Sequence, residues 1–105
     1  MLHLIYQAPL DRVILDRIAP GDEVVFLEAA TQGLLKNSLM SAKLTQLLEY
    51  DPLYVMSDAL AVRGILEVEL IEGIQMIDYE ALARDLEQDY TMIEHDGSVY
   101  VFNVR

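Results

Sequence analysis

Residues 52–86 constrain the fold more than any other part of the chain, because strand-like and helix-like segments alternate there. Residues 53–56 form a short apolar run rich in β-forming residues, and residues 57–64 follow with apolar positions typical of a helix. Residues 74–77 form a second strand-like run, and a helix is expected from Tyr79. Parallel strands need a long crossover connection, so this strand–helix–strand–helix order predicts a parallel sheet.

The boundaries of these two helices carry recognisable capping residues. Ser57 or Asp58 could accept hydrogen bonds from the free amides of the first helical turn, and Gly64 suits the left-handed conformation that ends a helix. Asp78 stands at the N-cap position of the helix that we expect over residues 79–86. We therefore predict side-chain caps at both starts.

Two more strands precede this stretch. Residues 2–6 predict a first strand inside the sheet. Residues 22–29 contain Val-Val-Phe-Leu at 24–27, the most continuous strand-like run in the chain. Such a run predicts a central strand that is buried on both faces.

Helical segments are expected between the strands. The first would begin with Pro9 in its first turn and end at Pro20-Gly21, with its core-facing residues at Leu10, Val13, Ile14 and Ile18. A short helix is expected around residues 31–35. A longer helix would be capped by Ser38 and would bury Met40, Leu44, Leu47 and Leu48.

The tail, residues 89–105, has a different pattern. Alternating apolar residues flank Asp96-Gly97, a dipeptide that favours a type I′ turn. We predict a C-terminal hairpin or edge strand added to the sheet. The expected fold class is α/β, a three-layer sandwich with a central, mostly parallel sheet, in a single domain of residues 1–105.

Composition excludes several classes of function. Eighteen acidic against seven basic residues give a net charge of −11, which disfavours direct binding to nucleic acid and to anionic membranes. The chain has no cysteine and therefore no disulfide, thiolate metal site or thiol nucleophile.

No run approaches the roughly 18 apolar residues of a membrane span, and no basic segment marks a signal peptide, so a cytoplasmic location is expected. An apolar share of 53 % fits either a well-filled core or a surface covered by a partner.

The chain resembles the small sulfur-relay subunits called TusB and DsrH, of the DsrE/DsrF/DsrH-like family. The residues that carry the resemblance run in the family's order over the first 86 positions: Met1-Leu-His3 with Ala8-Pro9, then 21–28, Tyr54-Val55, Asp58 with 60–65, and 73–79. The resemblance implies an α/β sandwich and a hetero-oligomer with TusC-like and TusD-like subunits of the same fold. In that relay, persulfide sulfur passes through a cysteine of the TusD-like subunit toward the enzyme that makes 2-thiouridine in tRNA.

Two departures from the family bear on function. Some DsrH-like members carry an early cysteine near the first helix, whereas this chain has none and cannot carry a persulfide itself. This favours the TusB-like role, which transfers no sulfur. The chain also continues beyond the family core, residues 1–88, into a tail that lacks the usual tryptophan, so family contacts made through that terminus do not carry over.

The polar residues allow only weak alternatives. His3 in the first strand and His95 in the expected hairpin loop lack metal-ligand spacing, which favours a satisfied strand histidine and a solvated loop histidine. Glu28, Asp58 and Asp78 each follow a strand, where α/β sheets place ligands, and could serve as an acid–base pair. Capping accounts for Asp58 and Asp78 at about 1 kcal/mol each.

Arg63-Gly64 could bind an anion or a partner's carboxylate, and Arg63 could equally stabilise the end of its helix. Tyr50, Tyr54 and Tyr79 could anchor an interface, although core edges are more usual places for tyrosine. No residue is assigned to catalysis, to a cofactor or to a metal, and no cofactor is expected.

We therefore predict a non-catalytic subunit, not itself an enzyme, of a TusBCD-like complex that supports 2-thiolation of the tRNA wobble uridine. Three alternatives stay open: a self-associating α/β protein that binds a ligand or a regulator, a DsrEFH-like subunit in sulfur oxidation, and a carboxylate-based hydrolase.

Overall fold

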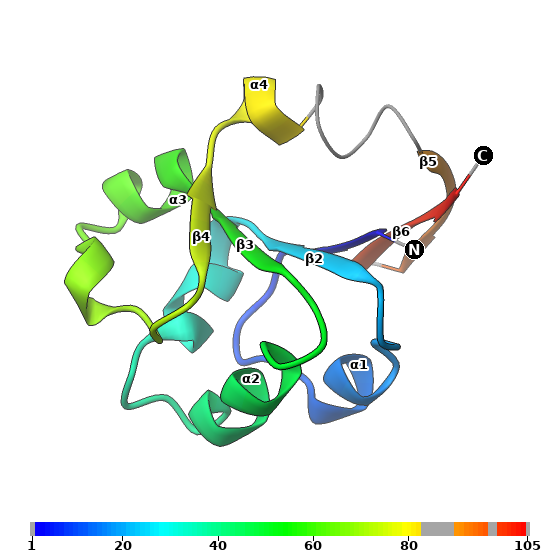
Figure 1. Ribbon diagram of the computed structural model, residues 1–105. Coiled ribbons are helices and arrows are strands. Elements are labelled where there is room, and N and C mark those ends of the chain that lie inside the picture. The colour runs from blue at the N-terminus through cyan, green and yellow to red at the C-terminus, as the bar shows by residue number, and fades with distance from the viewer. Residues whose placement is uncertain (1, 83–89, 97–98, 105) are drawn as a thin grey trace.

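The computed structural model describes residues 2–82, 90–96 and 99–104, and of Tyr79 and residues 90–96 and 99–104 it describes the backbone alone (Figure 1). These residues form one six-stranded sheet in the order β4-β3-β2-β1-β6-β5. The strands are β1 (Leu2–Ile5), β2 (Glu23–Phe26), β3 (Leu53–Met56), β4 (Gln75–Ile77), β5 (Tyr90–Asp96) and β6 (Val99–Val104).

The first four strands are all parallel, as the alternating sequence pattern predicts. β1 pairs with β2, β2 with β3 and β3 with β4. β2 lies between β1 and β3 with Val24, Val25 and Phe26 fully buried, which confirms the prediction of a central strand. β1 is also an inner strand, because its other side pairs with β6.

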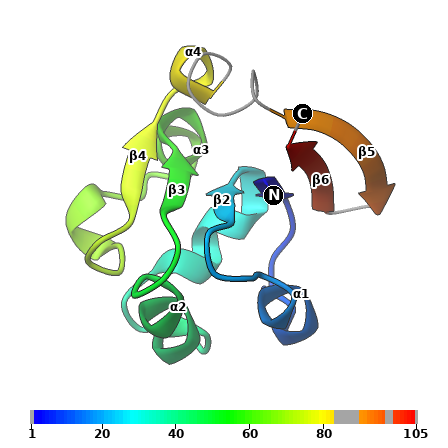
Figure 2. The same cartoon turned by 45° about the vertical axis from the view of Figure 1, so that its right-hand side comes forward.

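The tail forms the predicted hairpin. β5 and β6 are antiparallel, and β6 runs antiparallel to β1, so the hairpin extends the sheet on the side away from β4 (Figure 2). β5 ends at Asp96, which pairs with Val99 of β6. The predicted type I′ turn falls on residues 97–98, which lie outside the described residues.

Short helices connect the strands. They are α1 (Arg12–Asp16), the 3₁₀ helix η1 (Glu28–Leu34), α2 (Ser41–Leu47), α3 (Ser57–Val62), the 3₁₀ helix η2 (Glu67–Glu69) and α4 (Tyr79–Ala81). In Figure 1, α1 and α2 lie below the sheet and α4 lies above it, which confirms the α/β sandwich. The helix expected over residues 79–86 is described only as far as Leu82, because residues 83–89 lie outside the described part.

Apolar side chains fill both faces of the sheet because successive residues of a strand point to opposite sides. Val24 and Phe26 belong to the larger cluster, which also contains the buried apolar residues of α1, α2 and η1. Val25 belongs to a smaller cluster with Leu4 and with Leu82, which follows α4. The apolar runs in the strands therefore contribute side chains to a hydrophobic cluster on each face of the sheet.

The helix after β1 begins later than predicted. Its N-cap is Asp11, whose Oδ1 accepts a hydrogen bond from the Val13 N–H at 2.9 Å, and Pro9 lies before the helix in a cis Ala8–Pro9 peptide. Leu10 and Ile18 are buried in the larger core cluster and Ile14 packs against it, as predicted, but Leu15 is 1 % exposed and Val13 is 58 % exposed. The prediction that Val13 faces the core was therefore wrong.

Two predicted side-chain caps are also absent. The N-cap of α3 is Met56 and that of α2 is Met40, and neither start has a side-chain cap hydrogen bond. Ser57 lies inside α3 because the helix follows directly from β3, which leaves no turn between them. Ser38 accepts the Ser41 N–H through its backbone carbonyl at 3.2 Å. The end of α3 is as predicted, since Gly64 has a φ of +66°.

Candidate functional site

Three acidic residues follow the carboxyl ends of β2, β3 and β4, as the sequence indicates. The Asp78 Oδ1 accepts the Ala81 N–H at 2.7 Å, which confirms it as the cap of α4. Asp58 is exposed in the first turn of α3, and Glu28 is exposed at the start of η1. Within the described residues, no hydrogen bond joins any two of these carboxylates, so their placement does not add support to the acid–base interpretation.

Glu28 has an unusual backbone, which the sequence did not indicate. Its φ is +50°, in the left-handed region that non-glycine residues rarely occupy. The turn is held on both sides: the Thr31 hydroxyl donates to the Glu28 carbonyl at 2.8 Å, and the Ala30 N–H donates to the Tyr6 carbonyl at 3.1 Å. This turn brings η1 back against the segment that follows β1.

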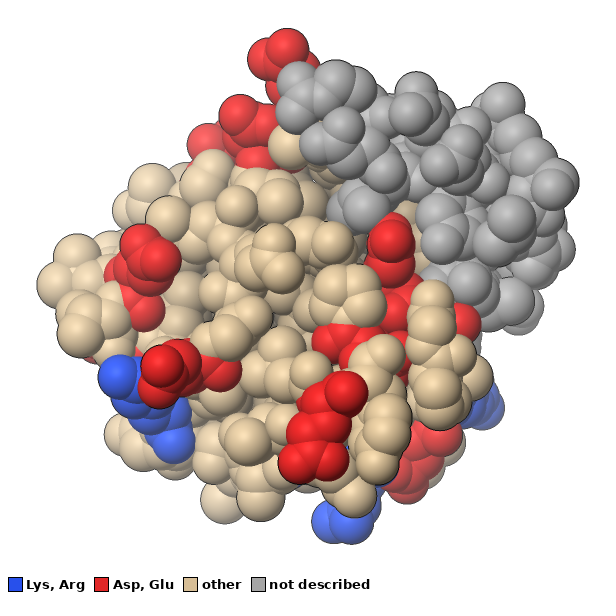
Figure 3. All heavy atoms as spheres, in the orientation of Figure 1, with Lys and Arg blue, Asp and Glu red and all other residues tan. Residues whose placement is uncertain are grey.

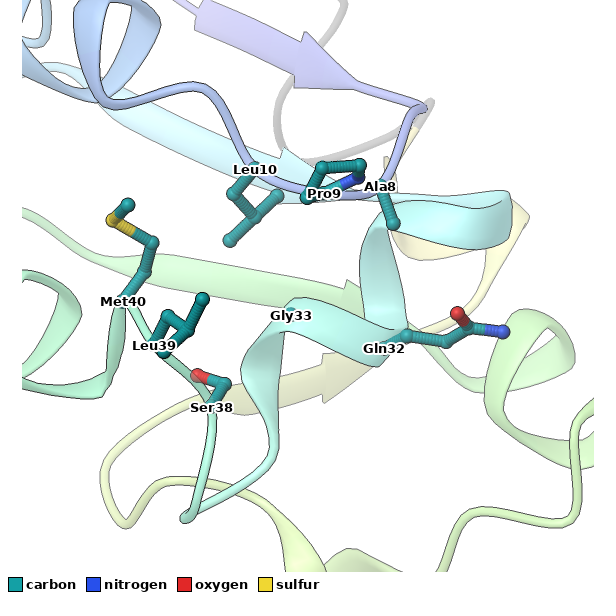
Figure 4. Close-up of a pocket in the computed structure, with 8 residues that line it drawn as sticks. All are labelled: Ala8, Pro9, Leu10, Gln32, Gly33, Ser38, Leu39 and Met40. Atoms are coloured by element: carbon teal, nitrogen blue, oxygen red, sulfur yellow. The ribbon is translucent and has the colours of Figure 1, made fainter.

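An apolar pocket of about 450 Å³ lies between that segment and η1 (Figure 4). Its lining comes from three parts of the chain: Ala8, Pro9 and Leu10; Gln32 and Gly33; and Ser38, Leu39 and Met40. Figure 4 shows Leu10 and Leu39 pointing toward one another across the gap, while the amide of Gln32 points away. The pocket is suited to an apolar group, because the polar atoms that could orient a charged ligand are few.

Two observations single out the Ser38–Met40 side of the pocket. Leu39 is 98 % exposed, so its side chain stands almost wholly in solvent. The Ser38 Oγ is buried, and within the described residues it has no hydrogen-bond partner. A buried hydroxyl without a partner costs free energy. The sequence predicted Ser38 as a helix cap and gave no sign of this pocket, because its three segments meet only in the folded chain.

A second polar cluster lies at the opposite, amino ends of the strands. His3 is 5 % exposed on β1, and its Nε2 lies 2.9 Å from Asp22 Oδ2, just before β2. The Ala19 N–H donates to the same Asp22 oxygen at 3.0 Å. Burial acts to raise the pKa of Asp22, the hydrogen bonds from Ala19 and His3 are among the contributions that act against it, and this pKa is lowered overall. The prediction of a satisfied strand histidine is confirmed.

Asp51, which precedes β3, completes this cluster. It is 4 % exposed, and burial raises its pKa, with a smaller contribution from the negative charge of Asp22. Backbone N–H groups of Gly21 and Asp22 act in the opposite direction. Among the described residues, no group of three histidine, cysteine, aspartate or glutamate side chains could hold a metal ion. The contact between His3 and Asp22 ties the amino ends of β1 and β2 together, whereas the Oδ1 of Asp51 is buried without a hydrogen-bond partner among the described residues.

His95 and Arg63, two further candidates from the sequence, lie on different elements of the fold. His95 lies in β5, opposite Tyr100, and not in the hairpin loop as predicted, because β5 continues to Asp96. The Arg63 guanidinium donates through Nη1 to the Ala59 carbonyl at 3.2 Å within its own helix, which supports the helix-end interpretation.

The three tyrosines considered as interface anchors lie on different elements, and the two whose side chains are described differ in exposure. Tyr50 is 63 % exposed after α2, while Tyr54 is half-buried on β3 against the smaller core cluster. Tyr79 begins α4, and its side chain lies outside the described part.

Comparison with known proteins gives one family. The family model described as DsrH like protein matches residues 7–92. A solved structure of a protein of unknown function from Methanobacterium thermoautotrophicum superposes with a TM-score of 0.53 at 21 % sequence identity, over 63 % of this chain and 60 % of that one. This likeness shows the fold alone, and the chain covers less than two thirds of that protein. No curated protein matches the sequence. Among the described residues, no helix is long and apolar enough to cross a membrane.

Proposed function

This chain belongs to the DsrH-like family, a family of accessory sulfur-relay subunits, and we propose that it is the non-catalytic, TusB-like subunit of a TusBCD-type complex. In this proposal the complex assembles in the cytoplasm from this chain and from TusC-like and TusD-like subunits. It passes persulfide sulfur toward 2-thiolation of the wobble uridine of tRNA.

One observation carries the proposal: a family match that covers residues 7–92 occurs in a chain without any cysteine. Relay of sulfur as a persulfide needs a thiolate that attacks and then leaves. This chain has no such group, so its part in a relay would be to complete the assembly. The reactive thiol would belong to the TusD-like subunit.

The arrangement of charge supports the same role. The net charge of −11 disfavours contact with the phosphates of tRNA, so the complex would meet its nucleic-acid product through other proteins. The exposed apolar side chains and the apolar pocket beside Leu39 give this chain surface that a partner could cover.

In this proposal the tail, residues 89–105, belongs to the same single domain as the family core, residues 1–88.

The proposal is tested by the 2-thiouridine content of tRNA from cells that lack this chain, measured by mass spectrometry of digested nucleosides. We expect loss of the modified nucleoside, with recovery when the chain is supplied again. An unchanged content would reject the tRNA branch of the proposal and favour a subunit that serves sulfur oxidation.

Assembly is tested separately, by mixing the purified chain with the TusC-like and TusD-like proteins of the same organism and following co-elution. A stable ternary species is expected. A homodimer or homotrimer that binds neither protein would instead favour the alternative hypothesis, a self-associating protein that binds a ligand or a regulator.

A further inference from the structure

Exposed apolar side chains gather on one side of the molecule. Val62 at the end of α3 is 81 % exposed, and Leu66 and Val68 in and beside η2 are 64 % and 69 % exposed. Met76 on β4 is 44 % exposed. We call these four residues the α3–η2–β4 surface. Of the seven large apolar residues that are exposed among the described residues, four therefore fall within fifteen positions of the chain.

This surface lies at one edge of the sheet. β4 ends the strand order, and α3 and η2 lie beside it in both views (Figures 1 and 2). β4 has only three residues, and within the described residues β3 is its one strand partner. The hairpin of β5 and β6 covers the opposite edge. The sheet is thus extended at one edge by its own chain and left short at the other, beside exposed apolar groups.

The charge around the surface is strongly negative. Glu67, Glu69 and Glu72 are exposed among the apolar residues, and residues 57–80 contain six acidic side chains against a single arginine. That arginine, Arg63, is half-buried and donates to the Ala59 carbonyl. Lys36 lies at the margin, where it lines a pocket of about 480 Å³ together with Glu67 and Glu72. Figure 3 shows this side with red carboxylates on a tan surface and a small blue area below them.

We propose that the α3–η2–β4 surface is the docking face for a partner subunit whose own face presents apolar side chains ringed by lysine and arginine. The proposal rests on the proposed function, because the partner is taken to be a subunit of the same complex. Burial of the four apolar side chains would supply affinity, and the opposite charges would orient the partner and speed association.

A second copy of this chain is a poorer occupant. In a symmetric contact the same patch faces itself, so Glu67, Glu69 and Glu72 of one copy would oppose the same carboxylates of the other. Like charges placed opposite one another at an interface are unfavourable, which argues against self-association through this face.

The test compares two variants of the full chain for binding to the purified TusC-like and TusD-like proteins, by titration calorimetry. Val62→Ser with Val68→Ser removes apolar groups from the surface, and Val13→Ser removes a comparably exposed valine from α1. We expect the double variant to bind at least about tenfold more weakly and the control to bind within about twofold of the parent chain. The far-UV circular dichroism melt of each variant checks that it folds.

A charge variant provides a second, independent readout. Glu67→Lys with Glu72→Lys alters only exposed side chains, and we expect it to slow association and to reduce the sensitivity of the association rate to salt. This variant decides the matter if the double serine variant does not fold.

The outcomes separate the two proposals. If the parent chain binds and both surface variants bind as well as the Val13→Ser control, this surface is not the docking face, and the proposed function stands. If the parent chain binds neither protein, the proposed complex is rejected, and this docking face is rejected with it.

Discussion

The imidazole Nε2 of His3 lies 2.9 Å from the Oδ2 of Asp22, which joins the first strand to the turn before the second. Both side chains are nearly shielded from solvent, with 6 % and 13 % of their side-chain surface exposed. The contact spans nineteen residues of sequence, and the Ala19 N–H shares the same oxygen. A bond of this kind fixes the position of β2 against β1.

Replacement of Asp22 by asparagine should lower the free energy of unfolding at neutral pH by about 1.5–3 kcal/mol, the usual range for hydrogen bonds to a charged group. The folded-state pKa of Asp22 lies below its ordinary value, so its stabilising contribution is present at neutral pH and is lost as the pH falls through that lowered pKa. Urea unfolding across the acidic range checks this. Glu72→Gln, at an exposed position, serves as the control, and an equal effect of both changes would contradict the role of the bond.

Asp51 should behave in the opposite way. Its folded-state pKa is raised, mainly by burial, so ionisation opposes folding, and its unfavourable contribution grows as the pH rises from the ordinary aspartate pKa to the raised one. Relative to the parent chain, Asp51→Asn should therefore gain stability as the pH rises from about 4, the ordinary aspartate pKa, until it passes the raised pKa of Asp51. The measurement is the difference in free energy of unfolding between the two proteins at each pH. A difference that does not change with pH would contradict the prediction.

The register of α1 predicts a contrast between two residues of the same helix. Leu15 is 1 % exposed and Val13 is 58 % exposed. Leu15→Ala should cost about 2–5 kcal/mol, because it removes buried methyl groups and leaves a cavity, whereas Val13→Ala should change stability by no more than about 0.5 kcal/mol. Chemical denaturation of both variants checks the pair. Equal costs would mean that Val13 faces the core, as the sequence pattern predicts.

The two aspartates that follow β3 and β4 predict a second contrast. Asp78→Ala should cost about 1 kcal/mol, because it removes the acceptor for the Ala81 N–H, while Asp58→Ala removes no such bond and should cost less than about 0.5 kcal/mol. Neither change should alter the 2-thiouridine content of tRNA in cells. Loss of that modification with either variant, at normal protein levels, would revive the acid–base hypothesis for these carboxylates.

The sequence by itself determined the strands and their direction. Apolar runs such as residues 24–27 and 53–56 are local signals, and the helical segments between them exclude tight turns, so a parallel sheet follows from the chain order alone. The antiparallel pair of β5 and β6 and the Asp78 cap are equally local, since each depends on residues that are close in the chain. The missing thiol was also evident from the sequence.

Only the tertiary structure decided the features that join distant segments. Val13 satisfied the helical spacing but turned outward, because Asp11 capped the helix and set its register. His3 met Asp22 because β1 and β2 pair in parallel, and the pocket beside Leu39 formed because the turn at Glu28 folds η1 back over the segment that follows β1. Spacing along a chain reports which residues can share one helix or strand; contacts between elements depend on packing in three dimensions, which no local pattern contains.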